Sequence, residues 1–270
     1  MPNLQHTTSG NFLLIAGPCV IEDEIIPMQV AEKLSTLSDK YRIPLVFKAS
    51  YKKDNRSRHD SYTGPGIEKG LTLLNKIKHR FSIPVLTDFH SEAEAAIAAE
   101  HVDILQIPAF LCRQTGILQA AAKTGKPVNI KKGQFLSGEA MRFAVEKMKA
   151  FGNHQLMLTE RGTSFGYHDL LVDFRNIPLM KENNVPVILD ITHSLQQPNQ
   201  ATGVTGGRPE MISTIARAGI AAGADGIFVE THPSPKTAKS DGANMLMLNS
   251  LEALLNELIP LYQLINNQKR

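Results

Sequence analysis

The sequence contains no tryptophan, only two cysteines, and few aromatic residues, which make up 6% of its 270 positions. Two cysteines, Cys19 and Cys112, are too few for the disulfide framework of a small secreted protein. No apolar run approaches the ~20 residues that a membrane-spanning helix needs. Residues 1–8 are polar where a secretory signal would be apolar. We therefore expect a cytoplasmic protein without a membrane segment.

A strong charge of either sign is also missing, since the formal net charge is +3. Such a small excess does not indicate a dedicated nucleic-acid-binding protein. The hydrophobic fraction of 42% and the charged fraction of 20% are typical of a folded globular chain. Two catalytic signatures are absent. Gly17-Pro18-Cys19 follows the first apolar run in place of the G-x-G-x-x-G of dinucleotide-binding folds, and no G-x-S-x-G occurs.

What the sequence does contain is a repeated unit, a short apolar run followed by a stretch of helical length. The runs, expected as strands, are 12–16, 45–47, 84–87, 104–107, 128–130, 155–158, 186–189 and 226–229. The helices are expected at about 24–40, 66–79, 92–100, 115–123, 138–151, 170–181, 209–222 and 248–264. Near-continuous apolar strands that alternate with helices indicate a parallel sheet covered by helices. Eight such units predict an α/β fold, a (β/α)8 TIM barrel in which residues 1–270 form one domain.

A basic segment follows the second predicted strand. Residues 48–58 carry five cations against a single acid, Asp54. Ser50, Asn55 and Ser57 add neutral hydrogen-bonding groups. Cations mixed with such groups after an apolar strand suit an oxyanion such as phosphate or carboxylate. The alternative is a basic loop that is simply solvated.

Further cations follow other strands, at the end of the barrel where barrel enzymes place their active sites. The combined cationic group is Lys48, Lys53, Arg56, Lys131 and Arg161, with Arg113 as a further candidate. Several cations in one concavity favour a phosphorylated small molecule with more than one anionic group. Ion pairs with Asp88, Glu160 and Asp190 are the structural alternative.

A second group of polar residues follows strands one, seven and eight. It consists of Cys19, His193, Glu230 and Asp241. Strands eight and one are neighbours in a closed barrel, so these four side chains can converge. A thiolate, an imidazole and two carboxylates suit Zn²⁺, Fe²⁺ or Mn²⁺. The alternative for Cys19 is a small buried apolar residue at a strand end, a description that fits Cys112 more plainly.

Several motifs, taken in order, resemble those of the 3-deoxy-D-manno-octulosonate 8-phosphate synthases. The resemblance spans residues 12–254 and is carried by Gly17-Pro18-Cys19, Lys53-Asp54-Asn55-Arg56-Ser57, the run 107–114, the run 131–135, Thr159-Glu160-Arg161-Gly162 and Glu230-Thr231-His232-Pro233. This family is formed of barrels, usually homotetramers. Its members condense phosphoenolpyruvate with D-arabinose 5-phosphate and water and release inorganic phosphate, a step of lipopolysaccharide synthesis.

The resemblance implies a role for most of the polar residues at the strand ends. The residues implied to hold phosphoenolpyruvate are Lys48, Ser50, Lys53, Gln106, Lys131 and Arg161. Arabinose 5-phosphate would contact Asn55, Arg56 and Ser57, and Phe110 and Arg113 would reach a neighbouring subunit's site. Lys131 is expected to be essential for turnover. Asp88, Asp190 and His193 are the candidates for moving protons.

The family also divides into metal-dependent and metal-independent branches, and the independent branch has asparagine at the position of Cys19. Cys19, His193, Glu230 and Asp241 all match the dependent branch, so a divalent metal is expected. Asp241-Gly242 is a pairing more typical of the independent branch. Two further departures are Arg58, where the family usually has serine, and residues 197–202, which lack the usual Leu-Pro-Gly-Gly. Those residues belong to segment 194–208, which we expect to be a mobile loop at the active site.

Two other functions fit a barrel of this kind. A 3-deoxy-D-arabino-heptulosonate 7-phosphate synthase shares the fold, phosphoenolpyruvate and a similar metal set, but usually carries Lys-Pro-Arg-Thr where this chain has residues 53–57. A non-catalytic barrel that senses sugar phosphates would bind its ligand without releasing phosphate. Testing arabinose 5-phosphate against erythrose 4-phosphate separates the two enzymes.

Overall fold

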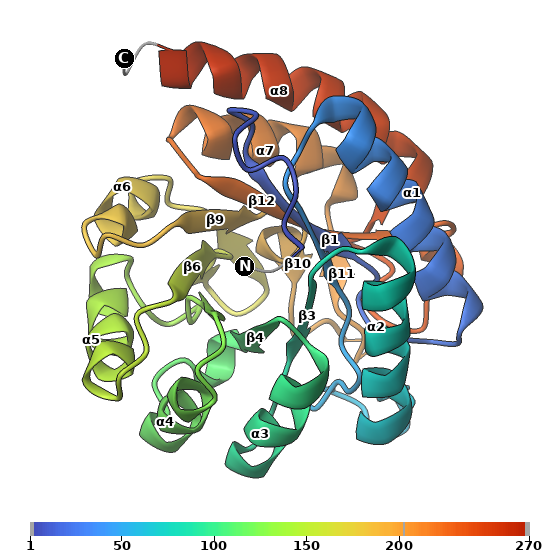
Figure 1. The fold of residues 1–270 in the computed structure, drawn as a ribbon, viewed down its shortest axis with the longest axis vertical. Coiled ribbons are helices and arrows are strands. Elements are labelled where there is room, and N and C mark those ends of the chain that lie inside the picture. The colour runs from blue at the N-terminus through green and yellow to red at the C-terminus, as the bar shows by residue number, and fades with distance from the viewer. Residues whose placement is uncertain (1–2, 202, 268–270) are drawn as a thin grey trace.

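The computed structural model describes residues 3–201 and 203–267, and these form a closed (β/α)8 barrel (Figure 1). The barrel strands, in spatial order, are β1 (Leu13–Gly17), β2 (Leu45–Lys48), β3 (Val85–Asp88), β4 (Ile104–Ile107), β5 (Val128–Lys131), β6 (Leu156–Glu160), β9 (Val187–Asp190) and β12 (Gly226–His232). All pair in parallel, and β12 pairs with β1 to close the ring. The predicted fold is confirmed.

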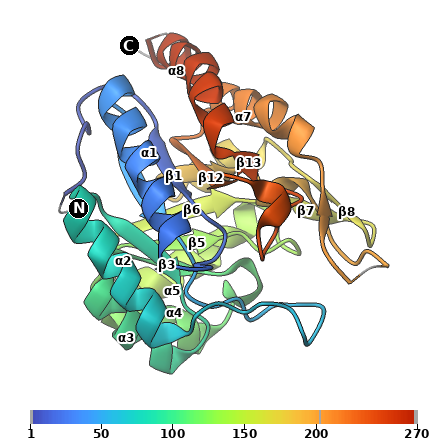
Figure 2. The ribbon, with the colours of Figure 1, turned by 90° about the vertical axis from the view of Figure 1, so that its right-hand side faces the viewer.

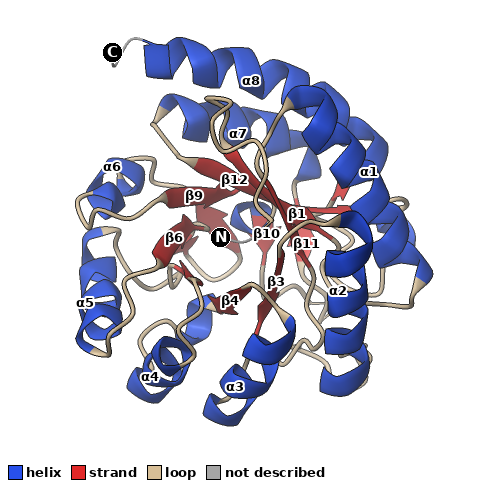
Figure 3. Cartoon of the chain, in the orientation of Figure 1, coloured by secondary structure: helices blue, strands red, loops and turns tan. Residues whose placement is uncertain are grey.

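Helices surround the strands on the outside, as the colouring by secondary structure makes clear (Figure 3). They are α1 (Ile25–Tyr41), α2 (Ile67–Phe81), α3 (Glu92–His101), α4 (Thr115–Lys123), α5 (Arg142–Ala150), α6 (Asn176–Lys181), α7 (Ile212–Ala221) and α8 (Leu251–Asn267). Among the described residues, no helix is both long enough and apolar enough to cross a membrane.

Apolar side chains fill two regions, one between strands and helices and one inside the barrel. The inner cluster takes one residue from each of seven strands: Ile15, Val46, Leu86, Ile104, Met157, Ile188 and Phe228. The strand β5 instead contributes Asn129, whose Nδ2 donates to Gln106 Oε1 at 3.0 Å and whose Oδ1 accepts from Thr159 Oγ1 at 2.7 Å. This buried amide is therefore satisfied on both sides, and it fixes the orientation of Gln106.

The closure between β1 and β12 brings together residues from opposite ends of the sequence. The register runs from Leu13 opposite Gly226 to Gly17 opposite Glu230. A Cβ on Gly17 would lie 1.9 Å from the carbonyl oxygen of Lys48, so only glycine allows this approach of β1 to β2. Cys19 follows two residues later. The backbone thus delivers Cys19, Lys48 and Glu230 to one side of the barrel mouth.

One predicted helix is partly wrong. Residues 170–181 were expected to be helical, but Asp169–Leu171 form strand β8, paired antiparallel with β7 (Thr163–Phe165), and α6 begins only at Asn176. Gly166, with a φ of 65°, lies in the turn between the two strands. The antiparallel pairing with the neighbouring β7 overrides the helical spacing of the leucines.

Three other helices begin later than predicted, at Arg142, Ile212 and Leu251. In each case the preceding three residues form a 3-10 turn, at Glu139–Met141, Pro209–Met211 and Leu248–Ser250. Such tight turns are common at helix starts and follow the same apolar spacing, so sequence periodicity does not separate them from the helix.

The segment 194–208 contains short regular elements. A 3-10 turn at His193–Leu195 leads into β10 (Gln196–Gln197), which pairs with β11 (Gly206–Gly207). Thr202, part of the expected loop, lies outside the described residues. In the side view the β7–β8 hairpin, the loop after β2 and the loop between β10 and β11 extend from the same end of the barrel (Figure 2).

Candidate active site

Two adjoining cavities open at the C-terminal ends of the strands in the described part of the chain. The inner cavity, about 250 Å³, is lined by Lys48, Lys53, Asp54, Asn55, Asp88, His90, Gln106, Pro108, Ala109, Phe110, Leu111, Lys131, Gln134, Arg161 and His193. The outer cavity, about 580 Å³, shares Lys53, Asn55 and Arg161 with it and adds Arg56, Ser57 and Asp241. The predicted residues that line these cavities therefore come from seven different strands and their loops.

Two of the predicted lysines are neutralised by buried carboxylates. Lys48 Nζ donates to Glu230 Oε1 at 2.9 Å and to Ser50 Oγ at 3.0 Å. Lys131 Nζ donates to Asp190 Oδ2 and lies 3.7 Å from the centre of the Phe228 ring. Burial lowers the pKa of Lys131 to about 8, although Asp190 opposes the shift. For Lys131 the ion-pair alternative describes the structure. Lys48 is also ion-paired, but with Glu230, which that alternative did not include.

The two arginines at the mouth are different, because buried nitrogens in each have no partner among the described residues. In Arg161 this is Nη1, while Nη2 donates to Gln196 Oε1 at 2.6 Å. In Arg56 both Nε and Nη2 are unpaired, and Nη1 lies 3.7 Å from Asp241 Oδ1. An unsatisfied buried guanidinium N–H is costly, so both positions call for an anionic ligand. Arg161 lines both cavities and Arg56 the outer one.

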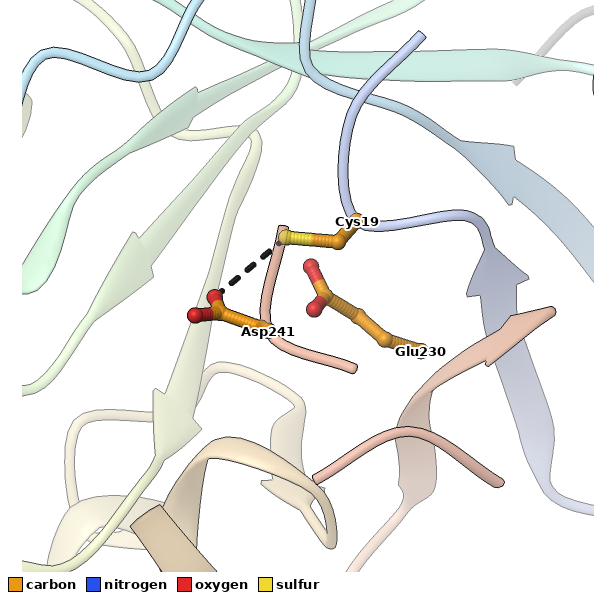
Figure 4. A group of neighbouring side chains, drawn as sticks. All are labelled: Cys19, Glu230 and Asp241. Carbon is orange, nitrogen blue, oxygen red and sulfur yellow. Dashed lines mark hydrogen bonds between the residues drawn. The ribbon is translucent and has the colours of Figure 1, made fainter. Parts of the chain in front are cut away.

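Three of the four predicted metal ligands converge on one point. One ligand atom each of Cys19, Glu230 and Asp241 lies within 4.8 Å of the others, and their side chains point toward one another (Figure 4). Cys19 Sγ contacts Asp241 Oδ2 at 3.3 Å and Ser240 Oγ at 2.9 Å. The fourth residue, His193, places Nε2 3.4 Å from Glu230 Oε2 and 3.9 Å from Asp241 Oδ2. All four side chains therefore face one small volume.

The chemistry of this cluster fits a divalent transition metal. Burial, and then the carboxylates of Asp241 and Glu230, raise the pKa of Cys19 well above its usual value. Burial alone would also raise the pKa of Glu230, but His193, Lys48 and Lys53 hold it well below the usual range. A thiol kept protonated beside buried carboxylates becomes a thiolate when a metal ion supplies positive charge. One sulfur, one imidazole and two carboxylates are suitable ligands for Zn²⁺, Fe²⁺ or Mn²⁺.

The backbone at Asp241 explains the glycine that follows it. Asp241 itself has a φ of 48°, a left-handed conformation that aspartate tolerates better than most residues. A Cβ on Gly242 would approach the carbonyl oxygen of Pro235 to 2.2 Å. Gly242 is therefore required by close backbone packing in this structure.

Asp190 holds His193 in place. Its Oδ1 accepts hydrogen bonds from the backbone N–H groups of Thr192, at 3.0 Å, and His193, at 2.8 Å, and its Oδ2 lies 2.6 Å from His193 Nδ1. Although burial would raise the pKa of Asp190, His193 and Lys131 hold it well below the usual range. The carboxylate stays charged, so Nδ1 of His193 keeps its proton and Nε2 is left to face the metal-ligand cluster.

The remaining predicted residues differ in their exposure. Ser50 is fully buried beneath the cavity and donates to Asp88 Oδ1. Phe110 lines both cavities but is 54% exposed, and Arg113 is exposed and lines neither cavity in the described structure. Arg58 is ion-paired with Asp60 at 2.6 Å, and its aliphatic carbons lie against Gly203. The expected influence of Arg58 on a phosphate contact stays a prediction.

Sequence reasoning gave no role to two residues that line the inner cavity. His90 follows β3, in Asp88-Phe89-His90, and its Nε2 lies 3.3 Å from Asp88 Oδ2. Gln134 has a buried Oε1 without a partner among the described residues. The signal for His90 was its place at a strand end. Gln134 lies in the run 131–135, one of the motifs that carry the family resemblance, but that motif alone assigned it no role.

Comparisons with known proteins agree with this architecture. The sequence model of the DAHP synthetase I family matches residues 5–266. A 2-dehydro-3-deoxyphosphooctonate aldolase of Koribacter versatilis is 51% identical over 249 residues, 91% of this chain and 89% of its own. An enzyme of the same name in Trichlorobacter lovleyi is 50% identical over 246 residues, 91% of this chain and 90% of its own. Another, in Acidithiobacillus ferrooxidans, is 46% identical over 265 residues, 98% of this chain and 93% of its own.

Proposed function

The chain belongs to the DAHP synthetase I family, and we propose that it is a 2-dehydro-3-deoxyphosphooctonate aldolase, that is, a 3-deoxy-D-manno-octulosonate 8-phosphate synthase. It condenses phosphoenolpyruvate with D-arabinose 5-phosphate and water and releases inorganic phosphate, as a step of lipopolysaccharide synthesis. The whole chain, residues 1–270, acts as one catalytic domain. The observation that carries this proposal is the pair of arginines with unpaired buried nitrogens at adjoining cavities, which suits two phosphorylated substrates.

Phosphoenolpyruvate binds in the inner cavity. Its carboxylate and phosphate meet the cationic side chains there and the amide nitrogen of Gln106, whose Oε1 is already taken by Asn129. The residues proposed to hold it are Lys48, Ser50, Lys53, Gln106, Lys131 and Arg161. Ser50 acts from below, by fixing Lys48 and Asp88. These groups chiefly position two polyanions that would otherwise repel each other.

Arabinose 5-phosphate binds in the outer cavity, against Asn55, Arg56 and Ser57. The unpaired Nε and Nη2 of Arg56 provide two donors for its phosphate. Phe110 and Arg113 reach the site of a neighbouring subunit, as the exposure of both supports. The active assembly is then a homotetramer.

In the reaction, C3 of phosphoenolpyruvate attacks the aldehyde carbon of the sugar phosphate while water adds at C2. Phosphate then leaves by cleavage of the C–O bond at C2. Lys131, with its pKa near 8, is charged at neutral pH and stabilises anionic oxygens on phosphoenolpyruvate. Asp88 faces the inner cavity as an ionised carboxylate and is the group placed to accept a proton from water. Asp190 keeps His193 oriented.

Cys19, His193, Glu230 and Asp241 would hold a divalent metal. When bound, it supplies Lewis-acid stabilisation for the aldehyde oxygen or for a water molecule. Lys48 and Lys53 lie 2.9 Å and 3.8 Å from Glu230 Oε1, so this proposed metal ligand also contacts the phosphoenolpyruvate site.

The competing function is that of a 3-deoxy-D-arabino-heptulosonate 7-phosphate synthase, since the matching family bears the DAHP name. Residues 53–57 favour the octulosonate enzyme, as do relatives 46–51% identical. The test is phosphate release from phosphoenolpyruvate with arabinose 5-phosphate or with erythrose 4-phosphate. We expect a strong preference for arabinose 5-phosphate over erythrose 4-phosphate. Equal or better use of erythrose 4-phosphate would contradict the proposal.

A further inference from the structure

A chain of polar groups, partly buried, runs from the inner cavity to the start of helix α3. His90 lies on the cavity wall with its side chain 9% exposed. Its Nε2 lies 3.3 Å from Asp88 Oδ2, and its Nδ1 lies 3.6 Å from Glu94 Oε2. Nδ1 has no hydrogen-bond partner among the described residues. The imidazole is thus held between two carboxylates, one of which faces the cavity.

Glu94 is itself fixed from two sides. Its Oε2 accepts a hydrogen bond from Tyr51 Oη at 2.6 Å and another from the backbone N–H of His90 at 3.0 Å. Tyr51 is fully buried, and its ring lies edge-on to the His90 ring with centres 6.2 Å apart. A Cβ on Gly70 of α2 would lie 2.3 Å from Tyr51 Cβ, so the missing side chain at Gly70 lets Tyr51 occupy this position. The packing of α2 against β2 therefore sets the position of Glu94.

The charges around His90 favour its protonated form. The acidic groups that face it are Asp88 from the end of β3, Glu94 from α3 and Asp54 from the loop after β2. Lys52 Nζ lies 3.9 Å from Glu94 Oε1, and Lys48 and Lys53 act on Asp88 from β2 and its loop. Burial alone would lower the pKa of His90, but the three carboxylates together raise this pKa. With both nitrogens protonated, the ring directs one N–H toward each flanking carboxylate.

We propose that Glu94 is a positioning residue: anchored by Tyr51, it holds the His90 ring in contact with Asp88, and so fixes the Asp88 carboxylate at the wall of the inner cavity. The role of Asp88 as proton acceptor rests on the proposed function, whereas the effect of Glu94 on His90 does not. Without Glu94 the ring loses the carboxylate facing Nδ1 and becomes neutral at a lower pH. Asp88 then loses a cationic partner.

The experiment compares Glu94→Gln with Glu92→Gln, an identical change at an exposed position in the same helical turn. The first readout is the NMR titration of the His90 ring, assigned by its disappearance in His90→Asn. We expect the His90 titration to move to lower pH in Glu94→Gln and to stay unchanged in Glu92→Gln. This readout needs no turnover, so it holds even if the proposed substrates are wrong.

The second readout is kcat/KM for phosphate release between about pH 6.5 and about pH 8. We expect the loss over this range to be about threefold greater in Glu94→Gln than in Glu92→Gln, because His90 discharges earlier. Tyr51→Phe removes only the hydroxyl that anchors Glu94. It should shift the His90 titration and the pH dependence of kcat/KM in the same direction as Glu94→Gln, but less. If Glu94→Gln does not fold, Tyr51→Phe tests the proposal instead. An unchanged His90 titration in a folded Glu94→Gln or Tyr51→Phe protein would overturn the proposal. If the wild-type protein is inactive but the His90 titration still shifts in Glu94→Gln, only the assigned reaction is refuted.

Discussion

Replacing Lys131 by methionine removes one positive charge from the inner cavity while retaining much of the side-chain volume. Lys131 is buried, and its Nζ contacts Asp190 and lies 3.3 Å from His193 Nδ1. Asp190 keeps four other donors: the backbone N–H groups of Thr192 and His193, the Thr192 hydroxyl and His193 Nδ1. The carboxylate is therefore not left unsatisfied, and we expect the fold to persist.

The catalytic cost is larger. A preorganised donor that stabilises developing charge is typically worth about 100- to 1,000-fold in kcat. We therefore expect phosphate release by Lys131→Met to fall by about that factor, with a thermal midpoint close to that of the wild type. The matched control is Lys69→Met, at an exposed site on α2, which should retain full activity.

The pH profile tests the same residue without mutation. With a pKa of about 8, Lys131 is about 90% charged at pH 7 and about 10% charged at pH 9. Because the charged form is the one that binds the anion, the rate should fall about tenfold on the alkaline side. Near wild-type turnover in Lys131→Met, or a flat alkaline profile, would refute the assignment.

Three further outcomes follow from the site and its support. Treatment with a chelator should abolish activity, and Mn²⁺, Zn²⁺ or Fe²⁺ should restore it. Among substitutions of the four ligands, Cys19→Asn should be tolerated best. Phosphate release and metal content are the measurements. Arg56→Ala should raise KM for arabinose 5-phosphate about tenfold or more while changing KM for phosphoenolpyruvate little, because its unpaired nitrogens face the outer cavity. Lys132→Met should destabilise the fold by about 3 kcal/mol in a denaturant titration, because buried Lys132 donates to three backbone carbonyls and lies 3.6 Å from buried Glu160.

Each of these has an outcome that contradicts it. Full activity after verified metal removal would assign the enzyme to the metal-independent branch. If Arg56→Ala raises the KM values for both substrates equally, Arg56 does not bind arabinose 5-phosphate selectively, and the assignment of the two substrates to the two cavities is wrong. For Lys132, the control Lys123→Met, on the exposed side of α4, should leave stability unchanged, and a similarly stable Lys132→Met would show that the buried ion pair contributes nothing.

The barrel could be predicted from the sequence because its signal is local and repeated. Each strand is a near-continuous apolar run, as expected for strands buried on both faces, and most outer helices bury an apolar face. The β7–β8 hairpin was missed because its pairing joins segments on either side of Gly166 that contain only three residues each. Such short strands carry too little alternation to outweigh a helical pattern.

The site could be predicted in part for a related reason. Closure of the barrel places every strand end at one mouth, so Cys19 and Glu230 were expected to meet although 211 positions separate them. What the sequence could not give is which charges are already paired. Lys131 donates to Asp190, whereas Arg56 and Arg161 have donors without partners among the described residues, and this difference depends on side-chain directions. The anchoring of His90 by Glu94 likewise depends on how α3 starts relative to β2.

The central claim is most directly tested by phosphate release from phosphoenolpyruvate and arabinose 5-phosphate, measured with the metal-loaded protein and again after chelation. The account predicts release that requires both substrates and that disappears with the metal. No release from the metal-loaded protein with both substrates present would contradict the proposed function.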